Sequence, residues 1–437
     1  MFGVLTYILI LAALILGALR KPPIAVAAVL CLFGLKQWGQ DTSAFLATHG
    51  QLTNFVVGSV TLVAVIQSAV RGRREARRIS GVEWLVLALY LYALVSVSWA
   101  PDWSQSLEQW TKQGPYIITV LLLAPVLLTD FDAARSALTW TALTGGYICA
   151  VALLLGHWGS RGLLIYGDAT ESETNPLALA SLAGTAFIVS ALSLSRANSM
   201  RMRLTALCCI PLSLAVILRS GSRGQLLAAG AGLLIAAPIA FRPKGARAAF
   251  NIVIAGILIV ALGVWASTLV AVDAERWSKG ESEEQVGGRV SNAAKLLSAT
   301  ASDPATAVFG LGNSASFEVI GFYPHITVVE VLAEEGVPGI VLYLSALVLT
   351  CANIWRMRFM LRERDVQTNT LAMLAGLFVF EFVLSCKQGS LLSSVYVFAY
   401  AITLARMSTA GSLRAASGPP AIAIGGAPRP RFSNLLR

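Results

Sequence analysis

The stretch Gly310–Gly339, with the sequence GLGNSASFEVIGFYPHITVVEVLAEEGVPG, decides how the rest of the chain is interpreted. It joins the longest polar segment of the chain to a long apolar segment. It contains His325, one of only three histidines, and three carboxylates, Glu330, Glu334 and Glu335, at the start of the apolar segment. Ionisable groups are costly beside a long apolar segment, and they tend to be kept there for a function. We therefore predict that this stretch forms one edge of a functional site.

Apolar residues dominate the composition and bound the fold class. Of the 437 residues, 56% are hydrophobic and only 13% are charged, and the mean hydropathy is +0.70. A soluble domain carries about 25% charged residues, so too few polar residues remain here to cover a large soluble core. Repeated apolar runs of about 20 residues instead predict an all-α polytopic membrane protein with about 12 transmembrane helices.

The basic residues predict how the chain lies in the membrane. The formal net charge is +10, and the Lys and Arg residues gather in short clusters between apolar runs, as in Arg71–Arg78, RGRREARR. This pattern is typical of loops on the cytoplasmic side rather than of a nucleic-acid-binding surface. All six cysteines lie in or beside apolar segments without metal-ligand spacing, so we interpret them as small core residues.

The hydropathy pattern predicts a single transmembrane domain at 1–406 and a disordered cytoplasmic tail at 407–437. Within the domain, 272–324 form one large outer loop, and 325–355 form a long helix that carries the histidine motif. A continuous helix over 327–355 would be roughly 43 Å long, which exceeds the hydrocarbon core of about 30 Å. We therefore expect its first two turns, with their carboxylates, to project from the membrane or to line a wet cavity.

Counting spans back from the basic loops places four ionisable side chains at the outer membrane face. Arg223 begins a span expected at 223–241, Arg289 lies in the large loop, His325 precedes a span and Lys387 follows one. Cations on the outer side run against the usual distribution, so they need another explanation. An anionic ligand would supply one, since the spans that begin near Arg223 and His325 also point their positive N-terminal ends outward.

Each of these residues also has a simpler explanation. A single Arg or Lys at a helix end is usually an interfacial charge that reaches the water, and arginine is common in loops. A lone histidine is more often a hydrogen-bonded structural residue, and we interpret His49 and His157 in this way. Glu381 lies inside an apolar span, where an ionisable group is a functional candidate, but we expect it to pair with a neighbouring helix.

The histidine motif resembles that of the O-antigen ligase and polymerase superfamily. In that family a histidine is followed at fixed spacing by the pattern Glu-x-Gly-x-x-Gly. His325 is followed here by Glu334, Gly336 and Gly339, which match the pattern. One position departs from it, because the family often has Asn directly after the histidine and this chain has Ile326. The polar neighbour of the histidine is therefore left open.

Two further segments resemble the same superfamily. The Ser222–Gly224 segment, SRG, is similar to the family's Ser-Arg motif at the start of a span. Arg289 precedes a Pro…Gly-x-Gly run at 304–312, as in the family's large periplasmic loop. The resemblance extends over roughly 175–400 by motif spacing, while the first half of the chain matches only in hydropathy.

The resemblance implies a GT-C-like glycosyltransferase of the bacterial inner membrane, with many spans and an active site that faces the periplasm. An O-antigen ligase transfers O-antigen polysaccharide from undecaprenyl pyrophosphate to the lipid A–core oligosaccharide in lipopolysaccharide biosynthesis. The implied partners are the undecaprenyl-pyrophosphate-linked O-antigen, the lipid A–core acceptor and membrane lipids, with no nucleic acid. No cofactor is implied, and we expect metal independence, although Glu334 and Glu335 leave a cation site open.

These residues suggest a mechanism for such a transfer. Arg223, Arg289 and Lys387 would bind the pyrophosphate and neutralise the charge that develops as it leaves. His325, with an ordinary pKa near 6.5, would act as the base that takes a proton from the acceptor hydroxyl. Direct attack would invert the anomeric centre. Supporting roles are predicted for three residues, Ser222, Glu334 and Arg161.

Other functions remain open. An O-antigen polymerase or a protein O-oligosaccharyltransferase of the same superfamily would share the donor and differ only in the acceptor. The single large outer loop and the SRG segment favour the ligase. A transporter or flippase of polyprenyl-linked sugars would also need cations, but it would carry charges deep along its path, where only Glu381 qualifies. The lack of a clear internal repeat also disfavours the inverted-repeat transporter plan.

Overall fold

The computed structural model describes residues 2–71, 79–159, 163–166, 177–194, 200–241, 279–361 and 365–416. Every regular element in these ranges is a helix, and the one isolated pairing of extended backbone there is a bridge between Trp158 and Leu163. The all-α prediction is therefore confirmed for the part of the chain that the structure describes.

The helices fall into two consecutive sets along the chain. The first set is α1 (Phe2–Arg20), α2 (Ile24–Thr42), α3 (Ala44–Thr48), α4 (Gln51–Val70), α5 (Gly81–Ser96) with the 3₁₀ turn η2 (Val97–Trp99), α6 (Trp103–Ile117), the π-helical stretch η3 (Ile118–Leu123), α7 (Ala124–Leu127), α8 (Phe131–Leu155), α9 (Leu177–Leu194), α10 (Met200–Arg219) and α11 (Arg223–Phe241). The second set is α13 (Lys279–Thr300), α14 (Pro304–Phe309), α15 (Ser316–Ile320), α16 (Thr327–Glu334), α17 (Gly336–Met360), α18 (Asp365–Gln388) and α19 (Val395–Ala416).

Nine helices in the described ranges are long and apolar enough to cross a membrane, which indicates a multi-pass membrane protein. They are α1, α4, α5 with η2, α8, α9, α10, α11, α17 and α18. Three more spans were expected at 22–37, 114–128 and 389–406. The chain is helical there, in α2, in α6 to α7 and in α19, but these helices are not among the nine. The span expected at 249–271 lies outside the described residues. The expected number of about 12 spans, and the GT-C-like arrangement, therefore stay predictions.

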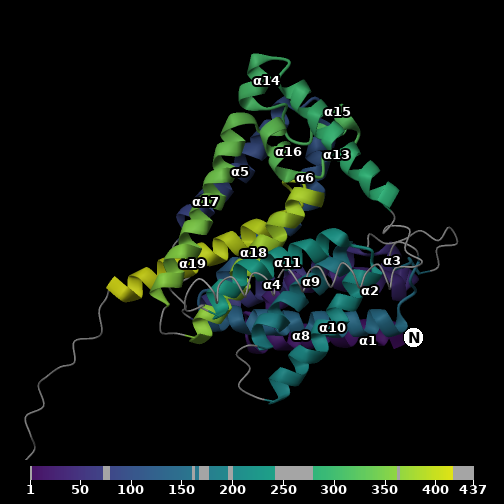
Figure 1. Ribbon diagram of the computed structural model, residues 1–437, viewed down its shortest axis with the longest axis vertical. Coiled ribbons are helices and arrows are strands. Elements are labelled where there is room, and N and C mark those ends of the chain that lie inside the picture. Colours follow the sequence, from purple (N-terminus) through teal and green to yellow (C-terminus); the bar gives the residue numbers. More distant parts are fainter. Residues whose placement is uncertain are drawn as a thin grey trace, which may run out of the picture.

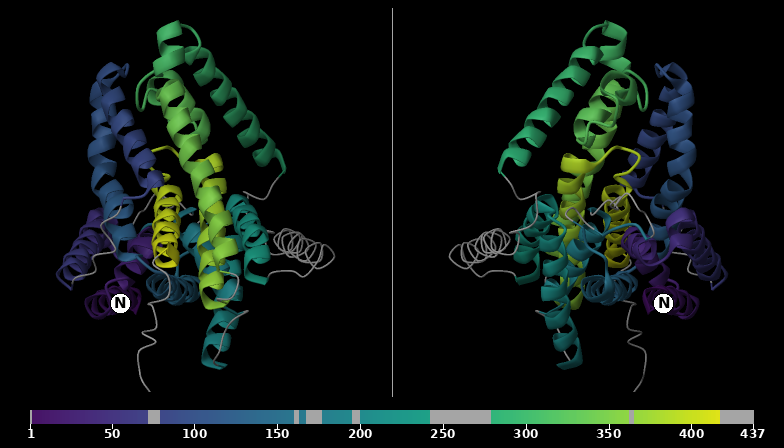
Figure 2. Two further views of the ribbon diagram at one scale, coloured as in Figure 1. Left: turned by 90° about the vertical axis from the view of Figure 1, so that its left-hand side faces the viewer. Right: turned by 90° about the vertical axis from the view of Figure 1, so that its right-hand side faces the viewer.

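Figure 1 shows the helices arranged in two parts, with α14 at the tip of the upper part. The helices α1, α2, α4 and α8–α11 lie together as a bundle, while α5, α6, α13–α16 and the start of α17 form the upper part. Figure 2 shows α13 rising obliquely toward α14, and α17 descending from that region toward the bundle. α18 packs against α9 and α11, and 72% of its span is buried, against 22% for α17. α18 is therefore a central helix of the bundle.

We call residues 279–336 the cap, which contains α13–α16 and the first residue of α17. Local signals in its sequence start and stop these short helices. Asp303 accepts a hydrogen bond from the Ala305 N–H at 3.0 Å, and Pro304 occupies the first position of α14. The cap corresponds to most of the predicted outer loop at 272–324 and continues through α16.

The long helix expected over 325–355 is not continuous. α16 ends at Glu334, and α17 begins at Gly336, which has a left-handed φ of +62°. The expectation was wrong because the apolar pattern runs through a break that is made by backbone geometry rather than by a change of hydropathy.

The carboxylates at this break had been expected to contact water, but they are buried. Glu330 is 4% exposed, and Glu334 and Glu335 are each 0% exposed. They are covered by other parts of the cap and by the turn between α18 and α19, which the expected straight helix would have left at a distance. At the other end of the chain, α19 continues to Ala416, past the expected boundary at 406, and 417–437 lie outside the described residues.

Candidate active site

The break between α16 and α17 is held by the segment 308–312. The Leu311 N–H donates to the Ala333 carbonyl oxygen at 2.8 Å. A Cβ atom at Gly336 would lie 2.3 Å from the Val308 carbonyl oxygen, which is closer than atoms can approach. Glycine is required there for this reason and for its positive φ. The Glu-x-Gly part of the motif therefore marks a break between two helices. A loop that lies about 25 residues earlier in the chain packs against this break.

The Glu334 carboxylate holds the neighbouring loop from the inside. It accepts hydrogen bonds from the backbone N–H groups of Ser314 at 2.7 Å and Ser316 at 2.9 Å. Burial raises the pKa of Glu334 to about 7, and the hydrogen bonds from Ser316 and Ser314 limit that rise. Beside it, the Asn313 amide donates to Glu335 at 2.8 Å. Glu334, which we expected to support the site, thus lies in the packing of the cap and shapes the loop between α14 and α15.

His325 lies between α15 and α16 in a left-handed backbone conformation, with φ +61°. Few residues other than glycine adopt this conformation, and it often marks a functional constraint. The imidazole packs edge-on against the Tyr323 ring, with the ring centroids 4.4 Å apart. Its Nδ1 atom is buried and makes no hydrogen bond to a described residue. Packing rather than a polar neighbour therefore orients the ring, which answers the question raised by Ile326.

α13 brings the positive charge of Arg289 close to His325. Burial, and then the Arg289 guanidinium, lower the pKa of His325 below its usual value of 6.5. Arg289 is itself partly buried, which lowers its own pKa. Burial raises the pKa of the Tyr323 hydroxyl, and the positive charge of Arg289 limits that rise. His325 is consequently neutral at pH 7, which is the form that accepts a proton.

Hydrogen bonds connect the start of α16, just after His325, to the last turn of α18 and to the turn between α18 and α19. The Thr327 hydroxyl donates to the Ser385 carbonyl oxygen at 3.1 Å and lies 3.0 Å from the Ser394 hydroxyl. Three residues further along α16, the Glu330 carboxylate accepts the Leu391 N–H at 3.2 Å. We call these contacts the seam, because they fix the histidine segment of the cap relative to the bundle.

Lys387 lies on the bundle side of the seam and crosses the start of α11. A Cβ atom at Gly224 would lie 2.2 to 2.6 Å from Lys387 side-chain atoms, so the absence of a side chain at Gly224 makes room for the lysine. The next residues also meet, since the Gln225 amide donates to Gln388 at 3.0 Å. Arg223, the first residue of α11, therefore lies next to the contact that Lys387 makes.

The remaining predicted site residues have different outcomes. Ser222 precedes α11, is 1% exposed, and its hydroxyl makes no hydrogen bond to a described residue. Arg161 lies outside the described residues, so its predicted role stays a prediction. In the described ranges, no group of three or more His, Cys, Asp or Glu side chains is arranged to hold a metal ion. Metal independence is not tested by this observation.

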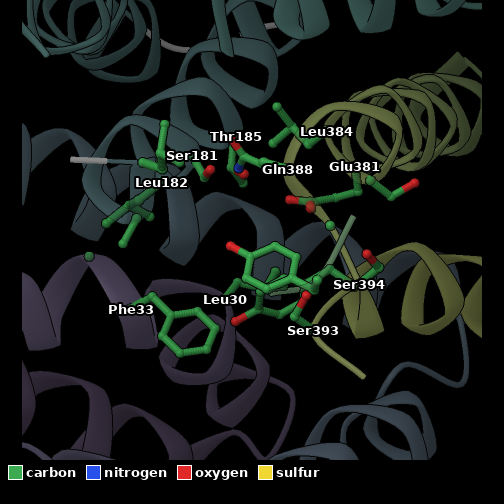
Figure 3. Close-up of a pocket in the computed structure, with 17 residues that line it drawn as sticks. Leu30, Phe33, Ser181, Leu182, Thr185, Glu381, Leu384, Gln388, Ser393 and Ser394 are labelled. Carbon is green, nitrogen blue, oxygen red and sulfur yellow. The ribbon is translucent and has the colours of Figure 1, made fainter. Parts of the chain in front are cut away.

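A cavity of about 270 Å³ lies beside both groups of residues (Figure 3). Tyr323, which packs on His325, and Gln388, which follows Lys387, both line it. None of the predicted site residues lines the cavity, but Glu381 does. The cavity and the seam could not be predicted from the sequence, because both arise from contacts between helices that are distant in the chain.

These observations indicate the class of protein. It is a multi-pass α-helical membrane protein with a histidine and cationic side chains at the starts of α11 and α16 and the end of α18. The family model described as O-antigen ligase matches residues 208–344. This match supports an O-antigen ligase-type family and agrees with the resemblance in the sequence. The segment includes Arg223, Arg289 and His325, whereas Lys387 lies beyond it. A comparison with curated proteins finds none that matches the chain.

Proposed function

We propose that the protein is an O-antigen ligase of the bacterial inner membrane. It transfers O-antigen polysaccharide from undecaprenyl pyrophosphate to the lipid A–core oligosaccharide at the periplasmic face. The observation that carries this proposal is the position of His325, which lies next to Arg289 and is joined by the seam to the turn after Lys387. A proton acceptor and binding groups for an anionic leaving group are thereby combined at one place, as glycosyl transfer from a pyrophosphate requires.

In the proposed reaction, an acceptor hydroxyl oxygen attacks the anomeric carbon of the donor sugar. A new carbon–oxygen bond forms while the bond from the anomeric carbon to the pyrophosphate oxygen breaks. The hydroxyl proton moves to His325, and undecaprenyl pyrophosphate leaves with the bonding electron pair. Attack from the side opposite the leaving group inverts the anomeric centre.

Two groups of residues contribute to the rate in different ways. A positioned base contributes about 10² to 10⁴ in rate, and His325 is suited to this because its pKa is lowered by burial and by Arg289. Each well-placed donor to a developing negative charge contributes about 10² to 10³. Arg223, Arg289 and Lys387 are the side chains that we assign to this second role, without a metal ion.

The test is transfer by the purified full-length protein in the presence of a chelator. It is mixed with undecaprenyl-pyrophosphate-linked O-antigen and lipid A–core, and the products are separated by size. We expect wild-type protein to form full-length lipopolysaccharide, and His325→Ala to be slower by about 10² to 10⁴. His49→Ala is the matched control, because His49 is exposed and contacts only its own helix turn through Phe45 and Thr48.

The other outcomes would change the assignment in different ways. Growth of the donor glycan without use of lipid A–core would indicate a polymerase. Movement of the donor across vesicles without any product would indicate a transporter. Inhibition by the chelator would contradict metal independence, and normal transfer by well-folded His325→Ala would contradict the role of the base.

A further inference from the structure

The cavity beside the site extends between the helices from one end of the bundle. Its wall includes residues of α2, α9 and α18 and of the turn between α18 and α19. Ser393, in that turn, is an exposed residue of the wall, so the cavity opens at the end of the bundle where Lys387 lies. Its volume of about 270 Å³ exceeds the roughly 150 Å³ of a cavity that holds benzene. One six-membered ring with its substituents therefore fits.

Glu381 is the most unusual group in the wall. It lies about 10 Å along α18 from Gln388, at 1.5 Å per residue. Figure 3 shows its carboxylate directed into the cavity. In the part of the chain that the structure describes, no hydrogen bond or ion pair joins Glu381 to another residue, so the expected pairing with a neighbouring helix is not observed. A carboxyl group at this depth is costly without a polar partner, and a ligand would provide one.

The opposite wall supplies further polar groups without partners. Ser181 and Thr185 are one turn apart on α9, and both line the cavity (Figure 3). Within the described residues, neither hydroxyl takes part in a hydrogen bond. Serine and threonine in helices commonly bond to their own preceding carbonyl, as Thr141 does on α8 at 2.9 Å. Hydroxyls that remain available on one side of a cavity, opposite a carboxylate, are suited to a ligand with several hydroxyl groups.

Aromatic rings complete the wall, since Phe33, Tyr323 and Tyr396 also line it. The described residues of the lining include no Lys, Arg or His, which disfavours an anion such as a pyrophosphate as the ligand. Its carboxylate and hydroxyls make it equally unsuited to an isoprenoid chain. A neutral ring with hydroxyl groups on its edges and apolar faces satisfies both kinds of wall.

We propose that this cavity binds one glycosyl ring through Glu381, Thr185 and Ser181. The proposal deepens the proposed function and rests on it, because the ring is either the first sugar of the donor glycan or a sugar of the acceptor. Tyr323 connects the cavity to His325, and Gln388 connects it to Lys387, so a ring held here lies beside both His325 and Lys387. Glu381, Thr185 and Ser181 are binding residues, outside the machinery assigned to proton transfer.

The test measures binding and turnover separately on the same protein preparations. The variants are Glu381→Gln, which keeps the shape of the side chain, and Thr185→Val, which removes one hydroxyl. Ser190→Ala is the matched control, because Ser190 is buried on the same helix but interacts with Cys209 instead of lining the cavity. Thermal unfolding establishes that each variant is folded, and Thr185→Val answers the question if Glu381→Gln does not fold.

Three probes separate the sources of the ring: undecaprenyl-pyrophosphate-linked O-antigen, undecaprenyl pyrophosphate without a glycan, and lipid A–core. We expect Glu381→Gln to raise the Kd for one glycan-bearing probe by about tenfold or more, and Thr185→Val to raise it several-fold. The Kd for undecaprenyl pyrophosphate without a glycan should stay unchanged. A donor-only effect identifies a donor sugar, and an acceptor-only effect identifies an acceptor sugar.

Unchanged Kd values for all three probes in both variants would overturn the proposal, as would an equal loss for the probe without a glycan. A wild-type protein that binds neither glycan-bearing probe would overturn it as well. Turnover distinguishes this failure from that of the proposed function. Product formation with unchanged Kd values in the variants refutes the cavity alone, whereas binding that depends on Glu381 without any product refutes the ligase assignment alone.

Discussion

The cap and the helix ends of the bundle hold their polar groups in different ways. In the cap, backbone geometry sets the positions: Gly336 and His325 have left-handed φ values, and Glu334 accepts two backbone N–H donors. At the helix ends, α11 begins where α18 ends, the two helices pack side by side, and Lys387 lies across Gly224. One region depends on backbone conformation, and the other depends on where helices begin and end.

This difference predicts how substitutions in the two regions should behave. A change at the helix ends shortens a side chain without altering the backbone, so it should affect ligand binding and rate more than stability. A change in the cap alters the backbone that carries the histidine, so it should affect stability and rate together.

Arg223→Ala gives the largest expected effect on the bundle side. We expect the rate of transfer to fall by about 10² to 10³, because a donor to the leaving pyrophosphate is lost. Its effect on thermal unfolding should be smaller than that of Gly336→Ala. Arg219→Ala is the matched control, since Arg219 ends the preceding helix and lies 5.0 Å from the centre of the Trp158 ring. Equal losses in the two variants would mean that general surface charge, rather than Arg223, accounts for the effect.

Gly336→Ala is the corresponding change in the cap. We expect it to cost more than about 2 kcal/mol, because alanine there would combine an unfavourable φ with a collision against the Val308 carbonyl. Thermal unfolding measures this loss. Gly321→Ala separates the two causes, since Gly321 has φ +83° with no atom within 4 Å of the added Cβ, and should cost only about 1 kcal/mol. Equal losses of stability in the two variants would show that the collision with the Val308 carbonyl does not add to the cost at Gly336.

The sequence predicted the bundle side of this comparison well. The span expected at 223–241 is α11, Arg223–Phe241, because a tight polar turn ends one apolar run and starts the next. Charges at span ends are visible in the sequence, so Arg223 and Lys387 could be assigned to one membrane face from the basic loops.

The cap could not be predicted in the same way. The break at Gly336 depends on contacts with 308–312, and the burial of Glu334 depends on N–H groups about 20 residues earlier in the chain. Hydropathy contains no term for such contacts, so the sequence suggested a straight helix and wet carboxylates. The expected pairing of Glu381 with a neighbouring helix is not observed for a related reason. Whether a side chain faces another helix or a cavity depends on how several helices pack.

Thr327→Val tests the seam that joins the two regions. The hydroxyl contacts the Ser385 carbonyl oxygen and the Ser394 hydroxyl, so its loss should cost about 1 to 2 kcal/mol of stability. Because the histidine segment would be held less firmly, we expect the rate to fall by about tenfold while the donor Kd is unchanged. Thr350→Val is the matched control, because the buried Thr350 hydroxyl bonds only within its own helix. A normal rate with lowered stability would limit the seam to folding.

The smallest expected effect is a change in the pH profile of Arg289→Gln, which is measured apart from its loss of rate and examines the cap without disturbing its backbone. Arg289 lowers the pKa of His325, because a nearby positive charge disfavours the protonated imidazole. Removing that charge should raise the pKa toward 6.5, although burial still holds it down. Since only the neutral imidazole accepts a proton, the acid side of the pH profile of kcat/KM should move to higher pH, by less than about one pH unit.

The direction of this change separates two roles of Arg289. If Arg289 binds pyrophosphate, Arg289→Gln also lowers the rate at every pH, but a loss of binding alone cannot move the acid side of the profile. Arg289→Lys keeps the charge and should leave the acid side where it is in the wild type, even if the forked contact to phosphate is lost. A profile that stays in place in Arg289→Gln would mean that His325 titrates independently of α13. A profile that moves to higher pH would make the cap, through Arg289, the region that sets the pH at which the base works.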